Sequence, residues 1–284
     1  MSVNLSEKAM LVRLTISQWS ARKYDRKVSD KVAKDYGASQ DAGRYSKVLI
    51  AEEAIKTIAQ AANEARTFHY ENTLPWRDDG ARILPAAQFE QYSKSLREFW
   101  SKFDRAVSDF VPRYADFVEH AKGRLNGMFD PSDYPPAHEI ADRYAFETAI
   151  DPIPDAPDFR VCLQAEDFAA IQASIEARNR VALDAAMRDL WTRLHDTVAR
   201  VAERLTDPDA IFRDSLITNL QDLCKVLPSL NLTNDPGLTR LADEVQGKLC
   251  RFAPDTLREH KLTRYQTAQD ATAILDAMRS CTGQ

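Results

Sequence analysis

An apolar residue recurs every seven positions from residue 89 to residue 117, and this repeat constrains the fold more than any other feature of the chain. A second series runs four positions behind the first, so that the two series are Phe89, Leu96, Phe103, Phe110 and Phe117, and Trp100, Val107, Tyr114 and Ala121. Alternating spacings of three and four residues place side chains on one face of an α-helix. The pattern predicts a long helix with one apolar face, kinked at Pro112 and ending near Gly123 and Gly127.

A second long helix is predicted over 165–205, where apolar residues again recur at helical spacing. The segment between the two helices, 128–162, holds six of the thirteen prolines, which exclude a long helix there. We expect it to contain a short helix at 137–144 and an extended piece at 145–153. That piece could pair with a strand at 10–17, which is rich in β-branched residues. The proline-rich return would let the two long helices lie antiparallel.

The rest of the chain also favours helices. Asp207-Pro208 and Asp235-Pro236 each place an N-cap acid before a first-turn proline. The remaining predicted elements are helices at 25–36, 46–71, 208–227, 236–250 and 254–280, with a punctuated loop at 72–85. Only 8 of 284 residues are glycine, against an average of about 7%, and this scarcity argues against a turn-rich β fold.

The predicted fold class is therefore mainly α. We expect a long antiparallel helical hairpin or bundle, with a small β element near the N-terminus and the proline-rich middle segment. We predict three domains. Residues 1–85 form an N-terminal basic segment with helices and the loop at 72–85, residues 86–206 form the long-helix hairpin with its proline-rich return, and residues 207–284 form a C-terminal bundle of short helices.

Composition also bounds the compartment. The opening residues contain no apolar core and no stretch approaches 18 apolar residues, so we expect neither a signal peptide nor a membrane span. The four cysteines lie far apart and form no C-x-x-C pair, which predicts reduced thiols at Cys162, Cys224, Cys250 and Cys281.

Known catalytic and nucleotide-binding motifs are absent from the sequence. Gly43 to Lys47 lacks the order of a phosphate-binding loop, and neither G-x-G-x-x-G nor G-x-S-x-G occurs. Neither H-E-x-x-H nor E-x-x-H occurs, and Asp116 with His120 is the closest approach to a pair of metal ligands on one helix face. We therefore expect no catalytic residues, no metal and no cofactor. An enzyme with an unrecognised site is the least favoured of three hypotheses.

Basic and aromatic residues are interleaved near the N-terminus. The first 50 residues carry ten Lys and Arg against five acids, although the whole chain has a net charge of −5. Cations can follow phosphates while aromatic rings stack on bases. Candidate nucleic-acid contacts are Trp19, Arg22, Lys23, Tyr24, Arg26, Lys27, Lys31 and Lys34. The alternative interpretation is a mixed-charge helix face with no ligand.

Four other residues are candidate contacts for a protein partner. Trp76, Arg77 and Arg82 lie in the predicted loop at 72–85, and Trp100 lies on the first long helix. Ordered loops with aromatic and charged residues often form contact sites. The alternative is a loop that folds Trp76 onto the core.

Several segments together resemble a family of tailed-bacteriophage proteins of unknown function, sometimes encoded near MoxR-type AAA+ ATPases and von Willebrand A-domain proteins. The segments are LVRLTISQWSARKYDRKVSDKV (11–32), TLPWRDDGARILP (73–85), MFDPSDYP (128–135), PIPDAPDF (152–159) and LNLTNDPGLTRLADEV (230–245). The resemblance implies a viral origin, a helical fold and a location in the cytoplasm of the infected bacterial host. It supplies no activity and no site residue.

The favoured hypothesis is a non-catalytic interaction protein that acts through its long helices. It would self-assemble, or dock on a phage or host protein, without a membrane partner. The alternative is a nucleic-acid-binding protein of phage replication or recombination that uses the basic and aromatic N-terminal segment.

Overall fold

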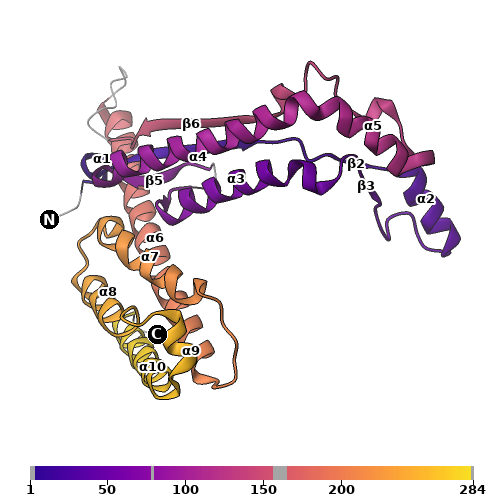
Figure 1. Cartoon of the computed structure of the whole chain (residues 1–284). Coiled ribbons are helices and arrows are strands. Elements are labelled where there is room, and N and C mark those ends of the chain that lie inside the picture. The colour runs from indigo at the N-terminus through magenta and orange to yellow at the C-terminus, as the bar shows by residue number, and fades with distance from the viewer. Residues whose placement is uncertain (1–3, 78–79, 156–164, 283–284) are drawn as a thin grey trace. The chain divides into compact units, whose positions relative to one another are not determined.

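The structure, a computed structural model, describes residues 4–77, 80–155 and 165–282 (Figure 1). Helices account for 67% and strands for 11% of the residues, which confirms the predicted mainly helical class with a small antiparallel sheet. Two compact units are present: unit 1 contains the described residues of Met1–Arg13, Tyr70–Tyr92 and Ala149–Gln284, and unit 2 contains Leu14–His69 and Ser93–Thr148. Cys162 and residues 156–162 of the proline-rich segment lie outside the described residues.

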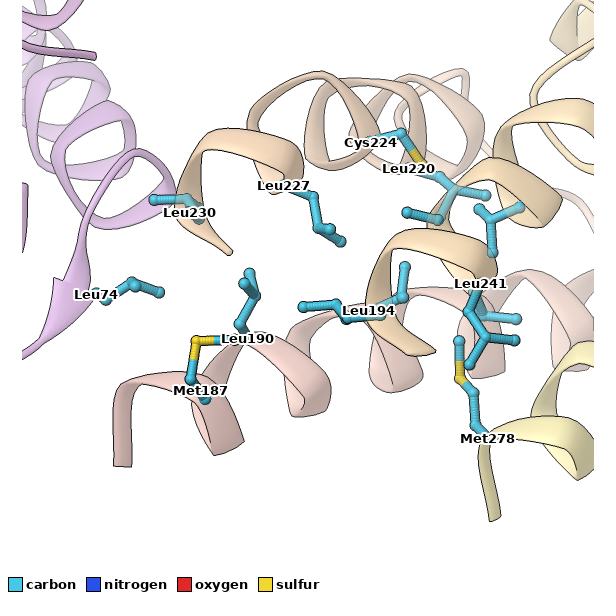
Figure 2. Packing of buried hydrophobic residues seen from close by; sticks show 14 of the residues in the cluster. Leu74, Met187, Leu190, Leu194, Leu220, Cys224, Leu227, Leu230, Leu241 and Met278 are labelled. Carbon is cyan, nitrogen blue, oxygen red and sulfur yellow. The ribbon is translucent and has the colours of Figure 1, made fainter. Parts of the chain in front are cut away.

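Unit 1 is built on the second predicted long helix, which is confirmed almost to the residue. Its larger helices are α6 (Ala165–Thr206), α7 (Ser215–Leu230), α8 (Pro236–Lys248), α9 (Pro254–Glu259) and α10 (Lys261–Thr282). The helix α6 packs against α7, α8 and α10. Figure 2 shows their core, in which Leu190 and Leu194 of α6, Leu227 of α7 and Leu241 of α8 are at most 1% exposed. These leucines lie three, four or seven residues from other buried residues, as a helix with one apolar face requires.

The two Asp-Pro signals have different outcomes. Asp235 caps α8 as predicted, because its Oδ1 accepts hydrogen bonds from the backbone N–H groups of Gly237 and Leu238. The prediction that a helix begins at Asp207-Pro208 is wrong. Asp207 Oδ1 accepts from the N–H of Asp209 within a turn, and α7 begins only at Ser215. A capped turn satisfies the same local geometry without a helix.

A four-stranded sheet has the strand order β4-β5-β1-β6. Its strands are β1 (Ala9–Ser17), β4 (Leu74–Pro75), β5 (Arg82–Pro85) and β6 (Ala145–Pro152), and a short helix, α1 (Leu5–Lys8), precedes β1. The predicted pairing of the segment at 145–153 with the N-terminal strand is confirmed, since β6 lies next to β1. The prediction of a loop at 72–85 missed β4 and β5, which pair with each other antiparallel. Their few residues are too short to show a strand period.

Unit 2 contains a second, two-stranded sheet and the first predicted long helix. Its elements are β2 (Arg22–Tyr24), α2 (Arg26–Asp35), β3 (Ser46–Val48), most of α3 (Glu52–Glu71) and of α4 (Phe89–Phe110), and α5 (Tyr114–Leu125). Pro112 interrupts the long helix as predicted, in a 3₁₀ turn between α4 and α5. The predicted short helix at 137–144 is only the 3₁₀ turn Ala141–Arg143.

Two members of the seven-residue repeat, Phe103 and Phe110, belong to the core of unit 2, and Phe117 packs against it partly buried. Leu96, Phe103 and Phe110 are at most 6% exposed, whereas Phe89 and Trp100 are 39% and 48% exposed. The prediction of one continuous inner face is therefore wrong at Phe89 and Trp100. At about 100° per residue, these two side chains lie toward one edge of the face that holds Phe103 and Phe110, and this edge is left partly uncovered. Pairing of the two long helices with each other, and the domain boundaries at 85 and 206, stay predictions.

Candidate functional site

The interleaved basic and aromatic residues form a hairpin with a helix inserted between its strands. β2 and β3 pair antiparallel, with Lys23 opposite Lys47, and α2 lies between them in sequence. We call residues 22–48 the basic arm. Asp25 caps α2, because its Oδ1 accepts a hydrogen bond of 3.1 Å from the N–H of Val28. The buried hydroxyl of Ser29 donates to the carbonyl of Asp25 and accepts from the N–H of Tyr45, which closes the arm. The arm is therefore an ordered platform.

A buried lysine anchors the base of the arm. Lys47 is 4% exposed, and its Nζ lies 2.5 Å from Asp133 Oδ2, 3.6 Å from Asp25 Oδ2 and 2.7 Å from the carbonyl oxygen of Met128. Burial lowers the pKa of Lys47, but the hydrogen bond to Asp133 and the charges of both carboxylates outweigh it and raise the pKa above its usual value. Lys47 thus joins the arm to residues 128–133, and its ammonium group has three partners within the protein.

Most of the other cations of the arm form no ion pair with a carboxylate in the part of the chain that the structure describes. The arm carries eight cationic and four acidic side chains. Arg22 pairs with Glu52, and Arg26 pairs with Asp30 at 3.6 Å. Among the described residues, no ion pair involves the remaining exposed cations Lys23, Lys27, Lys31, Lys34 and Arg44. The spacing of residues 27, 31 and 34 places three of these ammonium groups on one face of α2.

Aromatic rings accompany these cations at the surface. Tyr24, Tyr36 and Tyr45 are 48%, 85% and 39% exposed. The guanidinium of Arg44 lies 6.0 Å from the centre of the Tyr24 ring. An exposed tyrosine gains little from the core of its own protein, so these rings are free to stack against a ligand.

A hollow lies at the base of the arm. It has a volume of about 350 Å³ and is lined by Trp19, Arg22, Lys23, Leu49, Arg143 and the turn at 132–136. We call it the Trp19 hollow. The structure thus brings together three residues that the sequence pattern indicated, and adds Arg143, more than a hundred positions along the chain. No sequence signal identified Arg143, because only folding of the turn segment places it there.

The walls of the Trp19 hollow are held by internal contacts. The indole of Trp19 makes a T-shaped contact with Tyr114, with ring centres 5.7 Å apart. Tyr114 Oη donates to the carbonyl of Pro135, and Tyr134 Oη donates to the carbonyl of Leu49, each at 2.9 Å. Burial raises the pKa of Tyr114 to about 12, so its hydroxyl stays a donor at any physiological pH.

A second concavity lies beside the interruption of the long helix at Pro112. This groove has a volume of about 480 Å³ between the first turns of α3 and the α4–α5 junction. Its floor includes Phe110 and Phe117, whose rings stack at 5.6 Å. Its polar lining includes both acidic and basic groups, Glu53, Asp109, Arg113, His120 and Arg124. Charges of both signs do not favour one class of ligand.

The predicted contacts for a protein partner are dispersed. Trp76 is only 7% exposed and belongs to the core of unit 1, which agrees with the alternative of a loop folded onto the core and leaves little of the indole for a partner. Arg82 donates from Nε to Thr73 Oγ1 and from Nη2 to the Thr73 carbonyl, and is also engaged internally. Arg77 is exposed above the ring of Trp76, and Trp100 is exposed on α4.

The described residues provide neither a metal-binding cluster nor a membrane-spanning helix. Within the described ranges, no group of three His, Cys, Asp or Glu side chains could hold a metal ion, and Asp116 with His120 gains no third ligand. No helix in the described part of the chain combines the length and apolar character needed to cross a bilayer.

Comparisons with known proteins do not add to this description. No protein-family model, no curated protein and no solved structure matches the chain.

Proposed function

We propose that the protein binds nucleic acid through the basic arm. The observation that carries the proposal is the set of exposed cations without carboxylate partners, held on an arm whose backbone is capped and anchored. Cations that are not neutralised by the protein can neutralise phosphates and release their counterions. Three lysines along one face of α2 suit a linear array of such phosphates.

Aromatic side chains favour nucleic acid over other polyanions. Tyr24 and Tyr45 stand beside the cations of the arm, and Trp19 lines the hollow at its base. Stacking of bases on aromatic rings adds affinity that a simple polyanion cannot provide. We place this activity in phage replication or recombination, a context that rests on the resemblance to bacteriophage proteins alone.

The test is the salt dependence of binding to a labelled single strand of about 16 nucleotides, followed by fluorescence anisotropy. We expect affinity to fall steeply between about 50 and 200 mM salt. The triple variant Lys27→Gln, Lys31→Gln and Lys34→Gln should reduce the slope of log K against log salt by about 2, since each lost contact to a single strand contributes about 0.7.

A matched control removes three other exposed lysines of unit 2, in Lys56→Gln, Lys94→Gln and Lys122→Gln. This variant has the same net charge as the arm variant, so it should leave the slope nearly unchanged if the contacts are local. Equal slopes for the two triple variants, or no binding at low salt, would contradict the proposal.

We propose a second function, docking of a protein partner on the long helix. Its support is Trp100, which is 48% exposed on α4 although the repeat predicts it on the inner face. Exposed tryptophans often anchor interfaces. Light scattering of the intact protein, with and without Trp100→Glu, tests self-assembly. A mass of one chain for both proteins would remove self-assembly, and a larger mass lost in the variant would support it.

A further inference from the structure

We infer that the Trp19 hollow takes one unstacked base, so that the ligand of the arm is a single strand and not a duplex. This inference rests on the proposed function and deepens it. Arg22 and Lys23 belong both to the arm and to the lining of the hollow, so a strand bound along the arm reaches the hollow without leaving cationic surface.

The chemistry of the lining suits a nucleotide. The partly exposed side chains of Trp19 and Pro135 offer flat or apolar surface to the face of a base, whereas Leu49 is buried and only closes the lining. The hydroxyl of Ser132 donates to Asp130 Oδ1 and can accept a hydrogen bond from the edge of the base. A volume of about 350 Å³ is at the lower end of the range for small-ligand sites, which fits one nucleotide and not a base pair.

The charged side chains that line the hollow differ in whether they form ion pairs within the protein. Asp133 is the one acid among the described residues of the lining, and its carboxylate is ion-paired at 2.5 Å with Lys47, which it shares with Asp25. Arg143 and Lys23 are exposed, and no ion pair involves them among the described residues. Their charges are therefore available for the phosphates on either side of the inserted base.

Internal contacts hold the walls of the hollow in place before a ligand binds, so the nucleic-acid strand and not the protein would become ordered on binding. The T-shaped contact with Tyr114 holds the indole of Trp19 in one orientation. The hydrogen bonds from Tyr114 and Tyr134 fix the opposite wall relative to Leu49. A binding site that is formed before the ligand arrives loses less entropy on binding.

A duplex cannot use this site without disruption. Its bases are stacked inside the helix, and it presents phosphates and sugars to a concave surface of this kind. Extruding a paired base requires unstacking and unpairing, whereas a single strand presents its bases freely. The cations of α2 would still attract a duplex, so the inference predicts a difference in affinity and not an absence of duplex binding.

The experiment compares a labelled thymine strand of about 16 nucleotides with a duplex of the same length at one salt concentration, using the full chain. We expect the single strand to bind more tightly. Trp19→Leu keeps apolar volume but removes the ring, and should weaken single-strand binding by roughly 5- to 150-fold while leaving duplex affinity unchanged. Trp19→Phe should restore most of the loss.

Arg143→Gln provides a second variant, since this exposed side chain is not part of the core. It should weaken the single strand more than the duplex even if a Trp19 variant fails to fold. Tyr265→Leu, an exposed aromatic residue in unit 1, is the control for loss of a surface ring and should change neither affinity.

The outcomes separate the inference from the proposed function. If strand and duplex bind equally and Arg143→Gln affects both alike, the hollow takes no base, while loss of both on removing the α2 lysines would still support the arm. If neither nucleic acid binds at low salt, both proposals fail. A single-strand preference that disappears in Trp19→Leu and Arg143→Gln supports the inference.

Discussion

Removal of the buried ammonium group of Lys47 offers the sharpest test of how the arm is held. In Lys47→Met the apolar stem is kept, but two carboxylates lose their partner in a site where Asp25 and Asp133 are only 14% and 12% exposed. Breaking a buried ion pair by removing one partner costs about 3–5 kcal/mol, because an uncompensated charge stays buried. With a urea dependence of about 2 kcal/mol per molar, the unfolding midpoint should fall by about 1.5–2.5 M.

A matched exposed pair supplies the control. Lys102 lies 3.3 Å from Glu64, with both side chains more than half exposed. Lys102→Met should change the free energy of unfolding by less than about 1 kcal/mol, since exposed pairs contribute little. Both variants are compared by urea unfolding followed by circular dichroism. A Lys47→Met protein as stable as Lys102→Met would refute the reasoning.

Replacing the two acids that Lys47→Met leaves unpaired tests why the variant loses stability. Lys47→Met combined with Asp25→Asn and Asp133→Asn should recover a large part of the stability, because the amides carry no charge. If the triple variant is no more stable than the single one, packing and not charge explains the defect.

The pH dependence has a definite sign. The pKa of Lys47 is raised in the folded state, so its contribution to stability is fully present below the ordinary value of 10.5 and is lost only as the pH rises through the higher folded value. The wild-type protein should therefore lose this contribution only at alkaline pH.

Two further predictions concern unit 1. Asp235→Ala should cost about 1–2 kcal/mol in urea unfolding, because it removes the cap of α8 and the hydrogen bond from Trp191 Nε1 to Asp235 Oδ2. Asp207→Ala, in the same Asp-Pro context without a helix, should cost less; equal losses would show that these contacts of Asp235 add nothing. The hydrogen bond from Cys224 lowers the pKa of Cys250, so iodoacetamide should modify Cys250 faster in the wild type than in Cys224→Ala, as followed by mass spectrometry. Equal rates would exclude this influence of the Cys224 thiol.

Local signals predicted much of the fold. The apolar spacing over 165–205 identified α6, the break at Pro112 was placed correctly, and the strand at the N-terminus was found within one residue. These features depend on periodicity and on the missing N–H of proline, which act over a few residues. Predictions failed where one sequence pattern fits two local structures. At Asp207, the Asp-Pro pattern caps a turn and not a helix.

The candidate site was predicted only in part. The interleaving of Trp19, Arg22 and Lys23 with the lysines of α2 was visible in the sequence, and the structure gathers the first three around one hollow. The sequence could not show which cations are exposed and unpaired. Lys47 is one of several lysines in the segment, yet it is buried between two acids. Nor could the sequence predict that Arg143 lines the hollow, because its position depends on contacts between distant segments.

The sequence by itself determined the helical class, the positions of its main breaks and the charge of its N-terminal segment, because these follow from local periodicity and composition. Tertiary structure decided which cations stay exposed and which become structural, and it buried Trp76 while leaving Trp100 in solvent. Burial depends on what packs against a side chain from elsewhere in the chain. A local pattern states that a residue can enter a core, and only the folded chain provides the surface that covers it.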